Sequence, residues 1–511
     1  MARGEAPASR PPMSTLDRAL AAGLLVLLAL RFIAIEQDPP GGIVSSSGVF
    51  LTDEGHYLTP AKLYHTFGTW RTEQDFNWHL AAPLYSLLTA AMGYVFDPLL
   101  IPARCASVAF SAAGILVFYA ICRRARSRAE SLVCCLLAAA SFDNFTYSRL
   151  ALMEPLGTLL GLTALYLWVS WRGHWLGVAA SGLAAAAAVT VKANLVYTPA
   201  AVGILWLADA AVAWRGGLRR KAAATLGVFA AAACVPALAW LAAARHSPDV
   251  QQFHSSAGIM ANLSSLGGVL ANEAQLLWFY PQSSWRRVFV LAALLGAVWW
   301  AVGGRKPSGQ TPQGTEGRVS ARPLAAMALW GGLGWVFFGA LDYQVPRWLY
   351  FTIYPCAYLV VSLLVRVVPT GRRAAVLALL VAGHVLSQAP AVCRYAARPH
   401  KTSLLDAARA VAREVKGGGA AVPVLGNCAH LAALFSNHIR PLTTTIHRPG
   451  ELRDRVRYWR PAYFVGLKAE RELFRDECRG LIAAARPIAS YTVMDNYYDG
   501  TDLMLYQLEY K

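Results

Sequence analysis

Long apolar stretches recur along this chain, and they constrain its fold more than any other feature. Of its 511 residues, 56% are hydrophobic and only 15% are charged, whereas a soluble domain has about 25% charged residues. The stretches run to about 17–22 residues, the length of helix that crosses the roughly 30 Å hydrocarbon core of a bilayer. Membrane-spanning β-strands would instead alternate in hydropathy. We therefore expect an all-α polytopic membrane bundle with about 11 transmembrane helices.

These helices are expected where the apolar stretches are long enough to span. Their ranges are 16–35, 103–122, 130–148, 155–171, 175–191, 194–213, 222–244, 286–303, 323–341, 348–366 and 374–391. A further apolar stretch, from His79 to Phe96, would invert the alternation of charges in the links if it crossed. We expect it to form a juxtamembrane or re-entrant helix on the outer side.

Basic residues gather in alternate links, such as the runs from Arg123 to Arg128 and from Arg219 to Lys221. The positive-inside rule makes these links cytoplasmic, together with the N-terminus, whose first helix we expect to be retained. Two long loops, 36–102 and 245–285, then lie on the extracytoplasmic face of the cell membrane. Because the basic residues occupy orientation positions, the net charge of +18 does not indicate nucleic-acid binding.

The composition changes near residue 394 and divides the chain into two domains. We expect a membrane domain over 1–393 and a small extracytoplasmic α/β domain over 394–511. In the second domain the patterns predict helices at 403–416, 449–459 and 472–485, and strands at 421–426, 462–466, 488–494 and 502–509. The domain carries Cys428 and Cys478, for which a disulfide and two separate thiols are the alternatives.

An acidic pair, Asp53 and Glu54, follows the first apolar segment closely. Carboxylates near a membrane exit are costly and tend to mark a site. One of them can accept a proton from a substrate hydroxyl, or the pair can bind a metal. The alternative is an ordinary solvated loop, and we favour the functional interpretation.

Three further charged residues lie in very short turns on the same predicted face. Arg149 and Glu154 occupy one turn, where they either pair with each other or flank a substrate. Lys192 lies between two long apolar runs, where it either extends to the membrane surface as an anchor or binds a lipid phosphate.

A third turn contains Tyr343 and Arg347. A guanidinium binds phosphate through two parallel hydrogen bonds and keeps its charge near lipid, so Arg347 is a candidate phosphate ligand. His79 and His254 lie in the two long outer loops. A divalent metal ion is one possible partner of these histidines, although no ligand pair has diagnostic spacing.

The order of these motifs resembles that of the GT-C superfamily of polyprenyl-phosphate-sugar-dependent glycosyltransferases, over about residues 15–395. It is most similar to the branch of the protein O-mannosyltransferases and aminoarabinose transferases. The matching features are the acidic pair in the first outer loop, the stretch from His79 to Tyr85, Ser148 to Glu154, Lys192, and Arg347 to Pro355. The chain departs from the family where Leu80-Ala81-Ala82 separates His79 from Pro83, and where Trp348 replaces the usual tyrosine.

The resemblance implies a membrane glycosyltransferase with a polyprenyl-phosphate-linked sugar donor and a lipid, glycan or protein acceptor. Phosphate is already a competent leaving group, so cations that stabilise its growing charge supply most of the catalysis. Arg347 and Lys192 are the first candidates, with Arg149 behind them. Asp53 is the expected base and Glu54 the residue that orients the acceptor or assists, with inversion at the sugar.

Two other classes of protein compete with this interpretation. A transporter or lipid flippase shares the bundle, but such proteins carry internal repeats and charges near mid-span, whereas the charges here gather at one face. A non-catalytic envelope assembly protein is the third class, and it predicts that the Asp53 cluster tolerates substitution. The C-terminal domain has no catalytic signature, which favours a supporting role.

Overall fold

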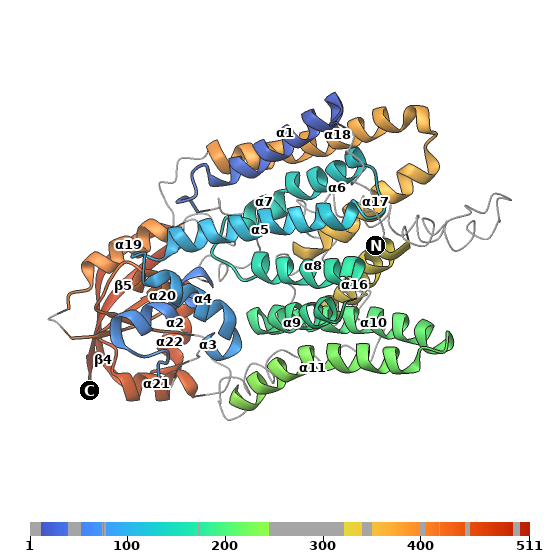
Figure 1. Cartoon of the computed structure of the whole chain (residues 1–511). Helices are drawn as coiled ribbons and strands as arrows, with labels where there is room; N and C mark the ends of the chain where they lie inside the picture. The colour runs from blue at the N-terminus through green and yellow to red at the C-terminus, as the bar shows by residue number, and fades with distance from the viewer. Residues whose placement is uncertain are drawn as a thin grey trace.

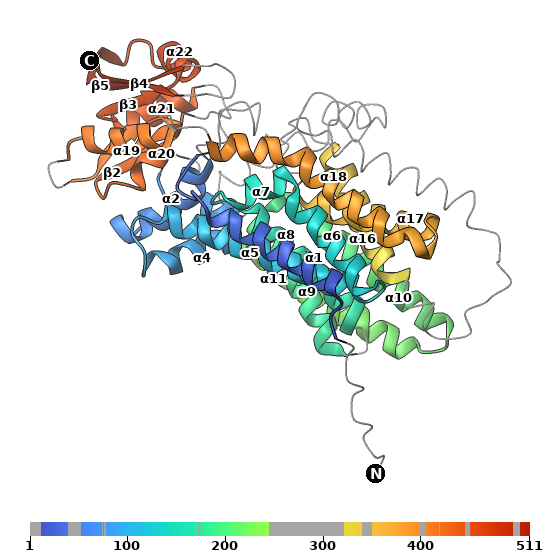
Figure 2. The same cartoon turned by 90° about the horizontal axis from the view of Figure 1, so that it is seen from above.

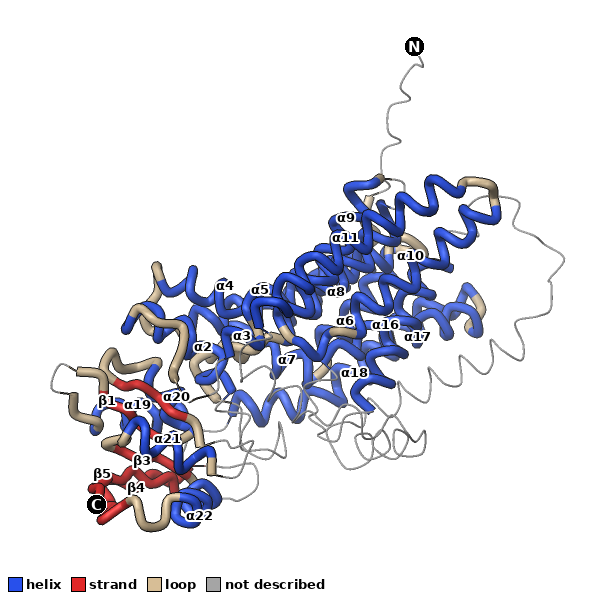
Figure 3. The backbone as a smooth tube through the Cα atoms, turned by 90° about the horizontal axis from the view of Figure 1, so that it is seen from below, coloured by secondary structure: helices blue, strands red, loops and turns tan. Residues whose placement is uncertain are grey.

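The protein consists of a helix bundle joined at one end to a small α/β domain (Figure 1). The computed structural model describes residues 12–38, 53–73, 75, 78–171, 174–244, 321–339, 350–397, 404–417, 420–444, 450–493 and 501–511. The expected loop 245–285 and helix 286–303 lie outside these residues. The strands are confined to one end of the molecule (Figure 3).

The bundle and its connections contain sixteen described helical elements. They are α1 (Thr15–Ala29), η1 (Leu30–Phe32), α2 (Asp53–Phe67), α3 (Trp78–Ala81), α4 (Pro83–Gly93), α5 (Leu100–Cys122), α6 (Arg128–Ala140), α7 (Phe142–Ser148), α8 (Glu154–Trp171), α9 (Trp175–Val191), η3 (Ala193–Leu195), α10 (Tyr197–Arg215), α11 (Arg219–Ala244), α16 (Ala321–Gly339), α17 (Ile353–Val367) and α18 (Thr370–Ala397). The expected helical bundle is confirmed.

Five described segments are long and apolar enough to cross a membrane by length and composition. They are Leu100–Cys122, Ala193–Arg215, Arg219–Trp240, Tyr350–Val367 and Thr370–Cys393. The helix α9 is apolar but shorter. Capping boxes begin two of the helices, with Ser14 and Asp17 at α1 and Ser127 and Glu130 at α6.

The helix expected over 130–148 is broken in the structure. Ser141 has an extended backbone (ψ 130°) and separates α6 from α7. The freed backbone N–H of Phe142 donates to Oε1 of Gln388, in α18, at 3.1 Å. The break thus depends on a side chain more than two hundred residues away. The local pattern of apolar residues does not reveal so distant a partner.

The stretch from His79 to Phe96 forms two short helices, α3 and α4. The 11 residues of α4 rise by about 16 Å, roughly half the hydrocarbon thickness, so α4 alone does not span a bilayer. It packs against α2, and both helices lie beside the α/β domain (Figure 2).

The α/β domain contains a five-stranded mixed sheet in the order β2-β1-β3-β5-β4. Strands β2, β1 and β3 are parallel, and β5 and β4 are antiparallel additions. Its elements are α19 (Leu404–Glu414), β1 (Val422–Leu425), α20 (Asn427–Ala433), β2 (Ile439–Leu442), α21 (Glu451–Trp459), β3 (Tyr463–Gly466), α22 (Lys468–Glu477), β4 (Ile482–Val493) and β5 (Thr501–Tyr510).

The domain differs from expectation in several elements: helix α20 was not predicted, and β4 begins at Ile482, six residues before the expected strand 488–494. Strand β2, which contains Pro441, was not predicted. The helix expected over 472–485 is wrong at its C-terminal end, because α22 ends at Glu477 and β4 begins at Ile482. Gly480 has φ +89°, a left-handed conformation that glycine adopts at no steric cost, and it lies in the turn between them.

All nine cysteines are free thiols, so the disulfide alternative for Cys428 and Cys478 is wrong. Each thiol is buried in a different hydrophobic cluster. Neighbouring residues of β1, Val424 and Leu425, divide between the same two clusters. Because successive side chains of a strand point to opposite faces, the sheet lies between the two thiols.

Candidate active site

The first turn of α2 carries Asp53 and Glu54, and both side chains are buried. Asp53 is 5% exposed and Glu54 is 1% exposed. Carboxylates at this position interact favourably with the partial positive charge of a helix N-terminus. The pair therefore belongs to the packed structure, and the solvated-loop alternative does not describe it.

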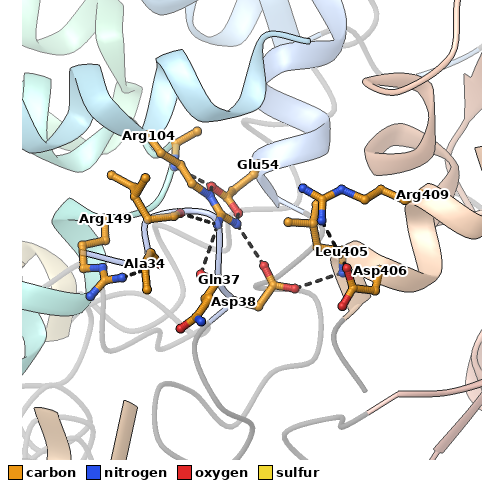
Figure 4. A network of polar contacts seen from close by, with 11 residues as sticks. Ala34, Gln37, Asp38, Glu54, Arg104, Arg149, Leu405, Asp406 and Arg409 are labelled. Carbon is orange, nitrogen blue, oxygen red and sulfur yellow. Dashed lines mark hydrogen bonds and ion pairs between the residues drawn. The ribbon is translucent and has the colours of Figure 1, made fainter. Parts of the chain in front are cut away.

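Glu54 forms a two-point ion pair with Arg104 of α5 (Figure 4). Arg104 Nε donates to Glu54 Oε1 at 2.8 Å, and Nη2 donates to Oε2 at 2.5 Å. The backbone N–H of Ala151 also donates to Oε1, at 2.6 Å. These bonds satisfy both carboxylate oxygens and fix α2 to α5 and to the turn between α7 and α8.

The segment 33–38, which leaves the first helix, presents carbonyl groups to two arginines. Arg104 Nη1 donates to the carbonyls of Ile35 and Gln37 at 3.0 and 3.1 Å, and Nη2 donates to Asp38 Oδ1 at 2.9 Å. Asp38 Oδ2 accepts from the backbone N–H of Leu405, in the α/β domain, at 3.0 Å. The segment thereby joins the bundle, α2 and the C-terminal domain (Figure 4).

Arg149 approaches the same segment from the other side. Its Nη2 donates to the carbonyls of Ile33 and Ala34 at 2.7 and 2.8 Å, and its guanidinium lies 5.0 Å from the ring centroid of Phe145. Ala34 has φ +52°, which is rare for a residue with a Cβ atom. The strained turn directs successive carbonyls towards the guanidinium groups.

Glu154 and Lys192 form an ion pair, with Lys192 Nζ 2.5 Å from Glu154 Oε1. Glu154 begins α8, and Lys192 follows the last residue of α9. The sequence left two alternatives for Arg149 and Glu154, a pair with each other or positions that flank a substrate, and the structure adds Lys192 as an ion-pair partner of Glu154.

Tyr85 of α4 lies near both charged pairs. Burial raises the pKa of its hydroxyl, and the negative charges of Glu54 and Glu154 raise that pKa further. The hydroxyl therefore lies within electrostatic reach of both carboxylates and stays protonated. The acidic pair of α2, the Arg149 turn and the Glu154–Lys192 pair accordingly meet at one end of the bundle.

Of the remaining predicted residues, one lies in α3 and three lie in the undescribed ranges. His79 lies in α3, half-buried, with its ring centroid 6.4 Å from that of Trp70. His254, Tyr343 and Arg347 lie outside the described residues. Their roles stay predictions.

Two buried arginines were not singled out from the sequence. Arg104 and Arg31 are each 0% exposed. Arg31 donates to Ser111 Oγ at 2.6 Å and to the carbonyl of Ala139 at 2.9 Å. A single arginine inside an apolar segment is itself a signal of function or of buried pairing, and attention to it would have found both residues.

A metal centre is one of the alternatives that the sequence leaves open. Within the ranges that the structure describes, no group of three or more His, Cys, Asp or Glu side chains is arranged to hold an ion. Glu54 uses both oxygens in its bonds to Arg104 and Ala151. His254 lies outside these ranges, and a divalent metal stays a prediction.

The bundle of apolar helices with its small α/β domain is similar in fold to solved glycosyltransferases of the GT-C type. The likeness expected from the sequence is confirmed at the level of the fold, and the chain is a multi-pass membrane protein. The family model for dolichyl-phosphate-mannose-protein mannosyltransferase matches residues 85–245. No curated protein matches the chain significantly in sequence.

Solved structures match the chain over nearly its full length. The crystal structure of ArnT from Cupriavidus metallidurans bound to undecaprenyl phosphate has a TM-score of 0.58 and 14% identity, covering 96% of this chain and 97% of that one. The oligosaccharyltransferase AglB from Archaeoglobus fulgidus, with an inhibitory peptide and a dolichol-phosphate, has a TM-score of 0.52 and 12% identity, covering 89% and 70%. A complex of the Archaeoglobus fulgidus oligosaccharyltransferase with Zn and sulfate has a TM-score of 0.52 and 12% identity, covering 96% and 75%.

Proposed function

We propose that this protein is a membrane glycosyltransferase that moves a sugar from a polyprenyl-phosphate carrier to an acceptor hydroxyl. Its active site lies on the extracytoplasmic face of the cell membrane, and its N-terminus is cytoplasmic. One observation carries the proposal: the acidic turn of α2, the Arg149 turn and the Glu154–Lys192 pair meet at one end of the bundle, joined by the hydrogen bond from Ala151 to Glu54. The fold and the family match over 85–245 support it.

Asp53 is the proposed general base. The acceptor O–H bond breaks and its proton passes to the Asp53 carboxylate. The acceptor oxygen forms a bond to the anomeric carbon, the bond from that carbon to the phosphate oxygen breaks, and polyprenyl phosphate leaves with the electron pair. A single displacement of this kind inverts the anomeric centre.

Glu54 is better suited to anchoring than to orienting the acceptor. Its two oxygens accept three hydrogen bonds from Arg104 and Ala151, and it holds the first turn of α2 in place beside them. Asp53 then has a fixed backbone from which to act, because a base is effective only within hydrogen-bond reach of the proton it takes.

The leaving phosphate is stabilised by cations in this proposal. Lys192 and Arg149 are the described candidates, and Arg347 is the candidate outside the described residues. The Glu154 carboxylate balances the charge of Lys192 before the donor binds and orients its ammonium group. A buried, water-poor site makes such preorganised charges effective.

The test is turnover of a lipid-linked sugar by the purified protein in proteoliposomes. We expect free polyprenyl phosphate and a glycosylated acceptor, both absent with Asp53→Asn. Asp406→Asn is the matched control, because Asp406 pairs with Arg409 on the surface and its side chain is 56% exposed. A flippase would move the donor intact, and full turnover by folded Asp53→Asn would remove the base assignment. Loss of turnover in EDTA, restored by a divalent ion, would establish a metal requirement.

A further inference from the structure

The C-terminal domain touches the proposed catalytic helix at the turn that carries Asp53. Helix α20 packs on α2, and the two lie side by side in both perpendicular views (Figures 1 and 2). A Cβ atom on Gly55 would lie 2.6 Å from the backbone nitrogen of Leu431 and 2.8 Å from the carbonyl carbon of His430. Only glycine permits so close an approach of the two backbones, and this glycine is two residues from Asp53.

A histidine from each of the two helices lies close to this contact, and the two rings are tilted against each other. The ring centroids of His56 and His430 are 4.0 Å apart, at an interplanar angle of 40°. The two residues are 7% and 4% exposed. Burial lowers the pKa of His56 to about 4 and that of His430 well below its ordinary value. Both rings are therefore neutral near pH 7 and place no competing cation beside Asp53.

A short chain of hydrogen bonds fixes which nitrogen of His430 carries the proton. Thr59 Oγ1 donates to the carbonyl of Gly55 at 2.7 Å, and a hydroxyl has one proton to give. His430 Nδ1 lies 3.0 Å from the same oxygen, so Nδ1–H must be the donor. The chain from His430 through Thr59 to Gly55 thus bonds the C-terminal domain to the backbone of the Asp53 turn.

Other contacts hold the domain in place independently of His430. Lys62 Nζ lies 2.6 Å from Asn437 Oδ1. Asp75 lies 3.3 Å from Arg455 Nε and accepts from the backbone N–H of Thr443 at 3.0 Å. Loss of the His430 hydrogen bond is therefore expected to loosen the first turn of α2 without releasing the domain.

We propose that His430 is a positioning residue for transfer, and that it acts through Thr59 and Gly55 to set the place of Asp53. The C-terminal domain is then part of the active site through α20. The claim that His430 affects transfer rests on the proposed function of Asp53. The claim that His430 orders the first turn of α2 rests on the contact between α2 and α20, whatever the function is.

The test compares two neutral replacements at position 430. Asparagine places an amide N–H where Nδ1–H lies, whereas glutamine carries its amide one bond further, at the place of Nε2. We expect His430→Asn to keep kcat within about twofold of wild type. We expect His430→Gln to lose about tenfold to a hundredfold in kcat, because a displacement of about 1 Å costs that much, with the KM for the lipid-linked donor unchanged.

The control is His438→Gln, in the same domain. His438 bonds to Ser436 and to the carbonyl of Val415, so it reports general loosening of the domain. Equal loss of kcat in the two glutamine variants, or equal kcat in His430→Gln and His430→Asn, overturns the positioning role.

Amide hydrogen exchange over residues 53–60 separates this inference from the proposed function. Faster exchange in His430→Gln, but not in His430→Asn, supports the hydrogen-bond chain whether or not a donor is turned over. Unchanged exchange in both variants overturns the chain even if the wild-type protein is an active transferase. A wild-type protein that consumes no lipid-linked sugar refutes the transferase proposal and, with it, the role of His430 in transfer.

Discussion

Glu54 and Arg104 form an ion pair with side chains 2% and 0% exposed, and this pair joins the start of α2 to the fifth residue of the apolar helix α5. The same guanidinium bonds to Asp38 and to two carbonyls of the segment 33–38. All its nitrogens are therefore engaged, and one side chain connects the bundle, the first outer segment and, through Asp38, the C-terminal domain.

Removing Arg104 is expected to destabilise the fold severely. Breaking a buried pair by deleting one partner costs about 3–5 kcal/mol, because the other charge stays buried. Arg104→Lys keeps the charge but loses the two-point geometry, so it should fall between Arg104→Ala and wild type. Thermal unfolding in detergent measures this order. Arg409→Ala, which removes an exposed pair with Asp406, should unfold close to wild type.

Gly55→Ala is expected to separate α20 from α2. The new methyl group would meet backbone atoms of His430 and Leu431 that have no freedom to rotate away. We predict loss of turnover and faster protease cleavage near the domain junction. Gly227→Ala, in α11, is the matched control because nothing lies within 4 Å of the added atom. Wild-type turnover in Gly55→Ala would contradict the close packing of the two helices.

The Glu154–Lys192 pair allows structure and function to be separated. Lys192→Met leaves Glu154 buried without its ammonium partner, so stability and turnover should both fall. The double variant Lys192→Met/Glu154→Gln removes the uncompensated charge and should recover much of the stability. If Lys192 contacts the donor phosphate, the double variant still binds the donor weakly, with a raised KM. Recovery of donor affinity together with stability would make the pair purely structural.

The His56–His430 contact predicts acid sensitivity. The folded-state pKa of His56 is lowered to about 4, below its ordinary value near 6.5, so the unfolded chain binds the proton more tightly. Stability is therefore complete above about pH 6.5 and is lost as the pH falls towards 4, by about 2 kcal/mol at pH 5. Buried His430 and Arg455 reinforce this direction. Denaturant unfolding at pH 7.5 and 5 tests it, and His56→Asn should flatten the difference.

The sequence predicted the helical bundle, because the length of an apolar run is a local property. Arg149, Glu154 and Lys192 could be singled out because each lies in a short turn between apolar runs. The structure brings these three charged residues together at one end of the bundle. The sequence did not predict the partner of Glu54, since Arg104 lies in an apolar helix fifty positions away. The break at Ser141 and the contact between the rings of His56 and His430 also depend on distant segments, which periodicity does not report.

The bond between Thr59 and His430 joins positions 371 residues apart. At about 5–20 residues per second, a ribosome needs roughly 20 to 75 seconds to synthesise that interval. Helix α2 is therefore synthesised well before the helix that carries its partner His430. An unfinished polypeptide that ends before residue 430 therefore lacks the hydrogen bond that we propose positions Asp53.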